Sequence, residues 1–558
     1  MAFEDNKLRI IPLGGVTEIG KNMTCFCYRD EILVVDAGLM FPEEDMPGVD
    51  IVIPDMTFLE ERADEVLGLV LTHGHEDHVG AIPYLLREMD IPIYGTALTL
   101  AIVRNKLEEH KLADVAKLNE VDYGDVIELG SFSVEYFRVS HSIPGAAGLI
   151  IRTPIGNIVC SGDFKFDQTP IDGKVANFSR LAEIGDEGVE YMLCDTTNVE
   201  KPGFTESESV VHDSLDKIFA SAEGRIIVAS FASHIHRLQQ VFDLAEKYGK
   251  KVAVAGRSME SNTAIAEELG YLTIGMGTRI GLDEIKSYED DKIVVLTTGS
   301  QGEPMSALSR ISMDEHKQVK IGEGDTVIIS ATAIPGNENL VWRTINRLFK
   351  RGAKVFYEPY TKVHVSGHGN SEDIKLLVNL VRPKNLIPVH GEYRHYSAFK
   401  RLAELMGYDE ENIFKLTIGD VLEIDEDGYG FIAEDKVDSG MVMVDGLGVG
   451  DVEDFVLRDR RHLAHDGIII IVLTMDDKHD SLLVEPDIIT RGFTVDEVME
   501  ELEDEARAVV IKALDEFLAN GVVEDTEEIK RVCRKAMAKF INETFRRRPM
   551  IVPLIMEI

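Results

Sequence analysis

The first part of the chain alternates short apolar runs with turns and amphipathic stretches. Runs of four to six mostly apolar residues are typical of buried strands, whereas apolar residues three or four positions apart indicate helices. Between residue 8 and about residue 198, strand patterns occur at residues 31–36, 132–137, 157–160 and 191–194. This alternation predicts an α/β unit.

Residues 203–351 show a second α/β pattern. Helical patterns at 212–219, 236–248 and 258–269 separate apolar strands at 225–229 and 251–255. Parallel neighbouring strands need crossover helices of this kind, so we expect a mostly parallel sheet here.

The remaining chain begins with strands at 354–357 and 386–390. Residues 437–451 contain four glycines and are predicted to form a linker. A strand at 467–471, amphipathic helices near 495–519 and 526–545, and a last strand at 550–555 follow. The length of 558 residues is too great for one core, so two to four folding units are expected.

The net charge of −41, from 58 basic and 99 acidic residues, limits the choice of partner. Such a field repels polyanions, yet divalent cations in a cleft would reverse the potential locally. No apolar run approaches a membrane span, and the amino terminus lacks a secretion signal. The five cysteines are an odd number in a large chain, and Cys25 and Cys27 alternate within a strand pattern. We therefore expect a cytoplasmic protein without membrane contact, in which those two cysteines pack in the core.

The main candidate for chemistry is the segment His73-Gly74-His75-Glu76-Asp77-His78. It follows an apolar strand pattern at residues 66–71 and precedes a helical pattern at 79–87, which places it at the carboxyl end of a strand. Imidazole and carboxylate side chains are ligands for zinc or manganese. Because several ligand types are concentrated within six residues, a metal site is the favoured interpretation.

Three further candidate ligands, His141, Asp163 and His390, each follow a predicted strand. Any one alone could equally be a cap or a core residue. Together with the first segment they predict a two-ion site, with Asp163 shared between two groups of ligands. The two groups are His73, His75 and His141 on one ion and Asp77, His78 and His390 on the other. Such a pair of cations, most simply Zn²⁺ with Mn²⁺ as the alternative, activates water, and Asp77 would accept a proton from it.

These residues resemble the metallo-β-lactamase superfamily, in which Asp36 matches the first motif and supports the metal loop. The segments 194–198, 363–369 and 388–392 resemble the three motifs of the β-CASP nucleases, and residues 13–15, 18–22 and 298–304 match further family segments. The chain is similar to the bacterial ribonuclease J family over essentially its whole length. This resemblance implies an αββα sandwich with an inserted α/β β-CASP domain and a small α+β carboxy-terminal domain. The implied domain ranges are 1–205 and 353–436 for the sandwich, 206–352 for the insertion, 437–451 for the linker and 452–558 for the carboxy-terminal domain.

The resemblance implies a ribonuclease with 5′-to-3′ exonuclease and endonuclease activity in RNA maturation and mRNA decay, and a preference for a 5′-monophosphate. It implies catalytic roles for Asp77, Asp195 and His368, the last at the scissile phosphate. Residues expected to contact RNA phosphates are Ser233, His364, Ser366, Gly367 and His368. For Ser233 and Arg237, a helix cap and a surface charge are equally weighted alternatives.

The expected partner is single-stranded RNA, because a site for one scissile phosphate would not admit a duplex. The carboxy-terminal domain is expected to form a homodimer or homotetramer, because its amphipathic helices and apolar last strand need partners. An RNA-degrading complex is a further expected partner.

The chain departs from the family pattern at three positions outside the predicted metal ligands. Gly145 stands where the family usually has Asp, His234 where it has Asn, and Thr17 where it has Gly. The change at His234 is expected to alter contacts with phosphate.

Two other functions are compatible with parts of this sequence. A hydrolase of small esters, thioesters or lactams would not need the inserted domain or the series Asp195, His368 and His390. A catalytically silent ribonuclease J paralogue, acting as an assembly subunit, should have lost metal ligands, whereas all seven are present. A metal-dependent ribonuclease is therefore the favoured function.

Overall fold

The computed structural model describes residues 6–43, 45–303, 305–333, 337–452, 454–476, 481–493, 496–519 and 526–557. Pro304 of the predicted motif and Val495 of the predicted helix lie outside these residues. The chain divides into two compact units. One holds residues up to 41 and 52–442, and the other holds residues 42–51 and 443–558.

Two sheets form the sandwich of the first unit. The larger has the strand order β21-β20-β1-β2-β3-β5-β6-β7 and the smaller β19-β12-β11-β10-β9-β8. The larger sheet consists of β1 (Leu8–Gly14), β2 (Met23–Tyr28), β3 (Glu31–Val35), β5 (Val66–Val70), β6 (Pro92–Gly95), β7 (Lys117–Glu120), β20 (Leu422–Ile424) and β21 (Gly430–Ile432). The smaller consists of β8 (Val126–Leu129), β9 (Phe132–Arg138), β10 (Ala147–Arg152), β11 (Asn157–Cys160), β12 (Tyr191–Asp195) and β19 (Asn385–Val389).

The core of the sandwich lies between the two sheets. Phe26 and Leu33 of the larger sheet belong to the same buried cluster as Tyr136, Leu149 and Tyr191 of the smaller one. The outer face of the smaller sheet packs on α5 (Phe178–Glu187), α11 (Ser371–Val381) and α12 (Tyr393–Leu405), and α4 (Ala97–Glu109) contacts β6 and β7. This arrangement confirms the predicted αββα sandwich, and Cys25 and Cys27 are buried as expected.

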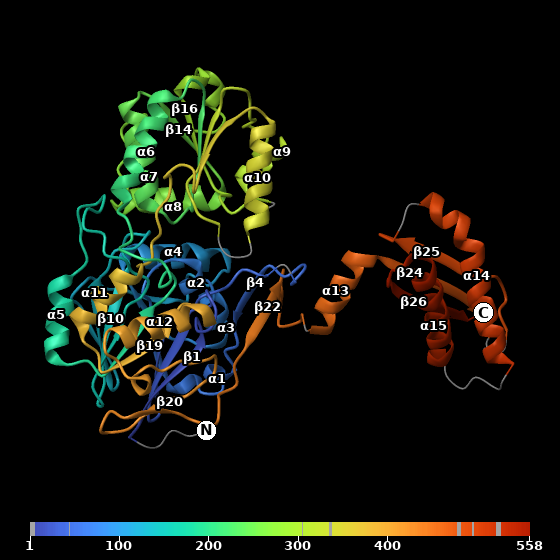
Figure 1. Ribbon diagram of the computed structural model, residues 1–558, viewed down its shortest axis with the longest axis horizontal. Coiled ribbons are helices and arrows are strands. Elements are labelled where there is room, and N and C mark those ends of the chain that lie inside the picture. The colour runs from blue at the N-terminus through green and yellow to red at the C-terminus, as the bar shows by residue number, and fades with distance from the viewer. Residues whose placement is uncertain are drawn as a thin grey trace. The chain divides into compact units, whose positions relative to one another are not determined.

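The inserted domain has one parallel sheet with the order β15-β14-β16-β13-β17-β18. Its strands are β13 (Ile226–Ala229), β14 (Lys251–Ala255), β15 (Arg279–Ile280), β16 (Ile293–Thr297), β17 (Thr326–Ile329) and β18 (Lys354–Tyr357). Helices α6 (Glu208–Ser221), α7 (Ile235–Lys247) and α8 (Arg257–Glu268) cover one face, and α9 (Ala307–Met313) and α10 (Glu338–Lys350) cover the other (Figure 1). Helices therefore bury both faces of the sheet, as is usual for parallel sheets, and the side chains that alternate along each strand are apolar on both faces.

The second unit is a small α+β domain, as predicted. Its sheet has the order β25-β24-β26, formed by β24 (Ile468–Met475), β25 (Asp487–Arg491) and β26 (Met550–Glu557). Helices α14 (Asp496–Leu518) and α15 (Thr526–Phe545) bury Leu514 and Met537 against Ile469 and Ile471 of β24. Helix α13 (Asp454–Asp466) precedes the sheet. No helix among the described residues is long and apolar enough to cross a membrane.

Two local predictions differ from the structure. The helix predicted at 79–87 is two short helices, α2 (Glu76–Val79) and α3 (Ile82–Glu88). The chain breaks between them because the Ala81 amide donates to the Ala37 carbonyl at 2.9 Å instead of continuing the α2 ladder. The predicted linker at 437–451 contains the hairpin of β22 (Met441–Asp445) and β23 (Gly448–Val449). The predicted domain limits themselves stay predictions.

Candidate metal centre and phosphate-binding loop

The loop after β5 carries the first group of site residues, and Asp36 at the end of β3 holds it in place. The Asp36 carboxylate accepts hydrogen bonds from the Thr72 amide, the Thr72 hydroxyl and His78 Nδ1, each at 2.8 Å. Since Nδ1 of His78 is used in this way, its Nε2 is left to face the centre of the site. Asp36 itself has a φ of 60°, a conformation that costs a non-glycine residue energy and is found most often at functional sites.

Glycine is required where α2 approaches β3. A Cβ built on Gly38 would lie 1.7 Å from the Asp77 carbonyl oxygen. Only a residue without a side chain allows the backbone carrying Asp77 and His78 to lie against the strand that carries Asp36. The sequence segment around Asp36 therefore shapes the histidine loop through its backbone as well as through its carboxylate.

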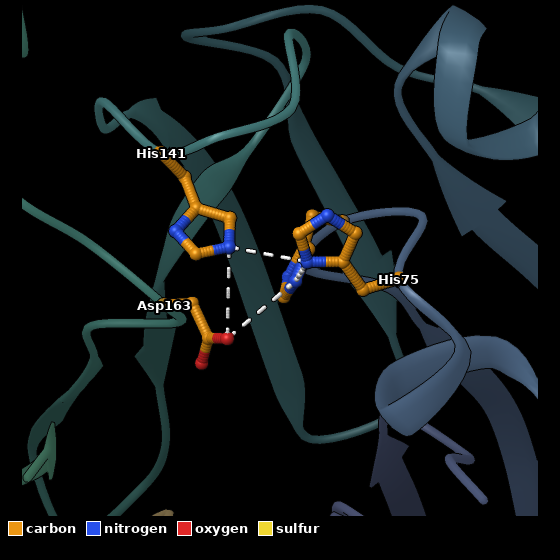
Figure 2. A group of neighbouring side chains, drawn as sticks. His75, His141 and Asp163 are labelled. Carbon is orange, nitrogen blue, oxygen red and sulfur yellow. Dashed lines mark hydrogen bonds and ion pairs between the residues drawn. The ribbon is translucent and has the colours of Figure 1, made fainter. Parts of the chain in front are cut away.

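Three histidines and one aspartate form the first cluster. His75 Nδ1 lies 3.1 Å from His73 Nε2 and 3.2 Å from His141 Nε2. The Oδ2 atom of Asp163 lies 3.6 Å from His73 Nε2 and 3.8 Å from His141 Nε2 (Figure 2). His141 donates from Nδ1 to the Gly367 carbonyl at 2.8 Å, which leaves its Nε2 unprotonated and directed at the cluster.

A second cluster shares Asp163 with the first. His78 Nε2 lies 3.3 Å from Asp163 Oδ2 and 3.8 Å from Asp77 Oδ2. His390 lies between the two carboxylates, with Nδ1 3.0 Å from Asp163 Oδ1 and Nε2 3.2 Å from Asp77 Oδ2. The structure thus brings all seven predicted ligands together and divides them into the two groups that were predicted, with Asp163 common to both.

Asp195 and His368 form an adjoining pair. His368 donates from Nδ1 to Asp195 Oδ2 at 2.8 Å, and Asp195 Oδ1 also accepts from the Thr197 amide and hydroxyl. These two residues lie close enough to Asp163 and His390 to form a third group of potential ligands. Because Nδ1 of His368 is held by Asp195, the contact fixes the ring and leaves Nε2 for another partner.

The histidines differ in their protonation. Burial lowers the pKa of His75 to about 4, and burial together with neighbouring imidazoles lowers the pKa of His73 and His141 well below the usual value. Burial alone would also lower the pKa of His390, but Asp163 and Asp77 outweigh it and raise this pKa to about 10. The first cluster therefore holds neutral imidazoles, the form that binds metal, while the second is rich in carboxylate charge.

The donor set fits divalent cations. It consists of imidazole and carboxylate groups without thiolate, and most of it is buried. Buried carboxylates next to basic rings are costly unless cations or hydrogen bonds compensate them. Sites of this composition favour zinc or similar ions and are typical of catalytic rather than structural centres.

The loop at residues 363–369 borders this centre. The Ser366 hydroxyl accepts from Asn198 Nδ2 at 2.7 Å and from the His368 amide at 3.2 Å, so its own proton is free to be donated. A Cβ on Gly367 would lie 2.6 Å from His141 Cε1, which explains why glycine stands beside this ring. Two of the predicted phosphate contacts, Ser366 and His368, are thus held next to the predicted metal ligands.

The remaining predicted phosphate contacts are Ser233 and His364, and His364 lies beside a buried ionic network of the inserted domain. His364, on the segment after β18, has an unpartnered buried Nδ1, and its ring lies 6.1 Å from that of His234. Ser233 precedes α7, whose first turn has no side-chain cap. The alternative that Ser233 caps this helix is therefore wrong.

Arg237 is fully buried, so the alternative that it is a surface charge is also wrong. It donates to Glu208 Oε2 and the Val363 carbonyl, each at 2.6 Å, and to the Ser330 hydroxyl. The Oε1 atom of Glu208 also accepts a hydrogen bond from His234 Nε2 at 3.1 Å. Sequence reasoning missed Glu208, because a lone acidic residue near the start of a helix looks like an ordinary first-turn acid.

A cavity of about 210 Å³ opens beside His141. Basic and aromatic residues from both domains line it, among them Arg138, Lys165, His236 and Tyr271. Ser140, which also lines it, has a buried hydroxyl without a hydrogen-bond partner. No role was expected for these residues from the sequence: Ser140, Lys165 and His236 stand beside predicted site residues, and only the tertiary structure shows that they share a cavity with Arg138 and Tyr271.

The three departures from the family pattern have structural explanations. Thr17 has a φ of 60°, which glycine adopts without strain, whereas Gly145, with a φ of 83°, accommodates a conformation that suits glycine better than aspartate. His234 is buried against Glu208. None of the three residues belongs to the two metal-ligand clusters.

Family models match four parts of the chain. They are the metallo-beta-lactamase superfamily at residues 17–229, the ribonuclease J beta-CASP domain at 223–348, the Zn-dependent metallo-hydrolase RNA specificity domain at 355–414 and the ribonuclease J C-terminal domain at 455–558. A solved structure of a protein of unknown function from Enterococcus faecalis V583 matches with a TM-score of 0.50 at 17% identity, covering 69% of this chain and 94% of that one. That likeness supports the fold alone.

Curated relatives match over nearly the whole length. Ribonuclease J2 of Bacillus subtilis is 43% identical over 551 residues, which cover 99% of this chain and 99% of the relative. Ribonuclease J of Thermus thermophilus is 45% identical over 559 residues, covering 99% of this chain and 95% of the relative. With this identity, this coverage and the four matched domains in order, the chain belongs to the ribonuclease J family.

Proposed function

We propose that this protein is a metal-dependent ribonuclease that hydrolyses RNA phosphodiester bonds with water. The observation that carries the proposal is the convergence of six histidine and aspartate side chains on one buried carboxylate, Asp163, beside a histidine held by Asp195. The matched RNA specificity domain and the relatives named ribonuclease J support RNA as the substrate. A hydrolase of small esters is not favoured, because the inserted domain and His368 would have no role in it.

Two divalent cations would be held by the two clusters, with Asp163 shared between them. His73, His75 and His141 would bind one, and Asp77, His78 and His390 the other. Zn²⁺ is the proposed ion and Mn²⁺ the alternative, because both accept imidazole and carboxylate ligands. When bound, such ions lower the pKa of water and offset the charge that develops on phosphoryl oxygens.

The side chains of the protein supply orientation and proton transfer. Asp77 reaches the edge of the clusters, where its carboxylate orients water and accepts its proton as the phosphorus is attacked. His368, fixed through Nδ1 by Asp195, directs Nε2 at the scissile phosphate. Water attacks the phosphorus in line with the oxygen that leaves, and the product carries a 5′-phosphate.

The 5′ end of a single strand would be read by groups on the other side of His368. The Ser366 hydroxyl, the Gly367 amide, Ser233 and His364 are the proposed donors to a terminal monophosphate. When the 5′-monophosphate is bound at a fixed distance from the metal clusters, nucleotides are removed one after another in the 5′-to-3′ direction. When an internal part of the strand enters the site and the 5′ end is not bound, the strand is cleaved internally. We propose both activities, in RNA maturation and mRNA decay.

Incubation with 5′-labelled single-stranded RNA tests the reaction and its direction together. We expect labelled mononucleotide to appear early when divalent metal is present and to disappear with chelator. His75→Ala should lower the rate by at least about 100-fold with an unchanged far-ultraviolet circular dichroism spectrum, because one ligand of the first cluster is lost. His465→Ala, at a histidine that is 90% exposed in the other unit, is the control. Full activity of His75→Ala would contradict the assignment of the site.

Metal affinity offers a test that does not depend on activity. Asp36→Asn keeps the size of the side chain but weakens the hold on His78 Nδ1, so we expect the affinity for Zn²⁺ to fall by about 10- to 100-fold. Competition with a metallochromic indicator measures this fall, and elemental analysis counts the ions bound per chain. Asp64→Asn, at an exposed aspartate, should match the wild type. A stoichiometry of one would contradict the two-ion proposal.

The terminal phosphate pocket predicts a preference among 5′ ends. RNA with a 5′-monophosphate should be degraded faster than its 5′-triphosphate form, because the larger group does not fit between the donors and the metal clusters. Ser233→Ala should reduce the preference by about tenfold, as expected for a lost hydrogen bond to a charged group, while cleavage of circular RNA stays unchanged. Ser287→Ala, exposed on the same domain, is the control. If the wild type degraded the 5′-monophosphate and 5′-triphosphate forms at equal rates, the result would argue against the pocket.

We further propose a cytoplasmic protein that forms a homodimer or homotetramer through its carboxy-terminal unit. The sheet of that unit is covered by helices on one face only, and on the other face Leu554 and Met556 are 47% and 51% exposed. On the neighbouring strand β24, Val472 pairs in register with Leu554 and Thr474 with Met556. An RNA-degrading complex stays a prediction.

Leu554→Glu in the full-length chain should lower the mass in solution to that of a smaller oligomer, because a charge cannot be buried in an apolar contact without compensation. Light scattering after size-exclusion chromatography measures the mass. Leu405→Glu, which changes a leucine that is 83% exposed in the other unit, should leave the mass unchanged. An unchanged oligomer in Leu554→Glu would exclude this face.

A further inference from the structure

One segment of the inserted domain has a net positive charge, opposite in sign to that of the whole chain. Residues 340–354 contain no acidic residue, although the whole chain has 41 more acidic than basic residues. The basic residues of this segment are Arg343, Arg347, Lys350, Arg351 and Lys354. They lie on α10 and at the start of β18, so the reversal is local and confined to one edge of the domain.

Helix α10 is divided lengthwise into two faces. Val341, Ile345 and Leu348 are buried against the sheet. On the flank of the helix beside this buried face, Trp342 and Phe349, seven residues apart and therefore aligned along the helix, are 45% and 47% exposed. Large aromatic side chains that stay this exposed along two turns of a helix are a signature of a binding surface.

Three cations of α10 lie on the part of its surface that is turned away from the sheet. At about 100° per residue, Lys350 lies about 80° around the helix axis from Trp342 and Arg343 about 100°, whereas Arg347 lies about 140° away. Within the described residues none of the three forms an ion pair or a side-chain hydrogen bond, whereas Lys354 is paired with Glu223 and Arg351 donates to the Ser312 carbonyl. Basic residues near the end of a helix complement its dipole, but that effect does not account for the exposed rings beside them.

Two tyrosines extend the aromatic surface onto the sheet edge. The ring of Tyr357, at the end of β18, lies 5.8 Å from Trp342, 6.3 Å from Phe349 and 5.4 Å from Tyr360. Tyr360 is 77% exposed. We call Trp342, Phe349, Tyr357 and Tyr360, with the cations Arg343 and Lys350, the aromatic platform.

The platform is connected to the catalytic region through the chain. Tyr357 and Tyr360 begin the segment that leads to Ser366, Gly367 and His368, and Trp342 lies in the first half of α10, which follows the carboxyl end of β17. In parallel sheets, ligands bind outside the carboxyl ends of the strands. Ser330, at the end of β17, and the Val363 carbonyl both contact Arg237, which ties this edge to the loop that borders the metal clusters.

We propose that the aromatic platform binds single-stranded RNA outside the active site and holds the part of a long substrate that the catalytic region does not reach. This inference rests on the proposed ribonuclease function. Bases stack on exposed rings without regard to sequence, and phosphates pair with adjacent unpaired cations, so both chemical features of the surface match one ligand. A protein partner would need carboxylates placed to match Arg343 and Lys350, whereas RNA carries a phosphate beside every base.

Kinetics on RNAs of two lengths test the proposal. For the metal-loaded enzyme we expect Tyr360→Ala and Lys350→Glu each to raise KM about 5- to 10-fold for an RNA of about 30 nucleotides, and to leave kcat/KM for one of about 6 nucleotides within about twofold. Tyr288→Ala and Lys286→Glu are the matched controls, because they change an exposed aromatic and an exposed base that follow β15, at the opposite edge of the same sheet.

Fluorescence gives a second readout that does not depend on cleavage. Trp342 is the single tryptophan of the chain, so the emission of the full-length protein reports on the platform. A phosphorothioate oligouridylate of about 30 nucleotides should quench it by stacking. Dextran sulfate, a polyanion without bases, should quench it less. Lys350→Glu should require several-fold more oligouridylate for the same quenching.

The outcomes separate this proposal from the proposed function. Equal KM values for wild type and platform variants on the long RNA, with no quenching, would overturn the platform even if the short RNA is cleaved. Quenching without any cleavage by the wild type would support the platform and reject the ribonuclease function. A change in solution mass in Tyr360→Ala, with unchanged KM and quenching, would identify the surface as a protein contact and overturn the RNA proposal.

Discussion

The buried carboxylate of Asp163 is the constraint on which the site depends. Five histidines lie within 3.9 Å of it, namely His73, His78, His141, His368 and His390. A carboxylate removed from water is costly unless positive charge surrounds it, and here the rings and the cations they can hold provide that charge. Together with Asp77, Asp163 raises the pKa of His390 to about 10, whereas burial lowers that of His75 to about 4. The imidazoles of the two clusters therefore differ in basicity although both clusters share Asp163.

The scaffold fixes this arrangement from outside the two clusters. Asp36 orients His78, the Gly367 carbonyl orients His141, and Asp195 orients His368, so three rings are held through the nitrogen that does not face the centre. The residues that orient them come from separate segments of the sandwich and from the loop at 363–369. Arg237 connects that loop to the inserted domain through Glu208 and Val363. These contacts fix the inserted domain to the loop that borders the metal clusters.

An excess of acidic residues is compatible with a polyanionic substrate because positive charge is placed locally. Cations bound at the two clusters and the unpaired bases of α10 would supply this charge where RNA is proposed to lie. The remaining surface repels nucleic acid, which would favour dissociation of product and limit non-specific binding. Binding should accordingly weaken as salt concentration rises.

The sequence by itself determined the strand and helix pattern, the seven candidate ligands and their division into two groups, because the ligands occur at strand ends in recognisable motifs and matching strand ends meet at one edge of a sheet. It did not show that Glu208 and a buried Arg237 join the two domains, that α2 and α3 are separate, or that Trp342, Phe349, Tyr357 and Tyr360 share one surface. Those features depend on burial and on contacts between residues far apart in the chain. Local periodicity carries no information about such contacts, so only the tertiary structure decided them.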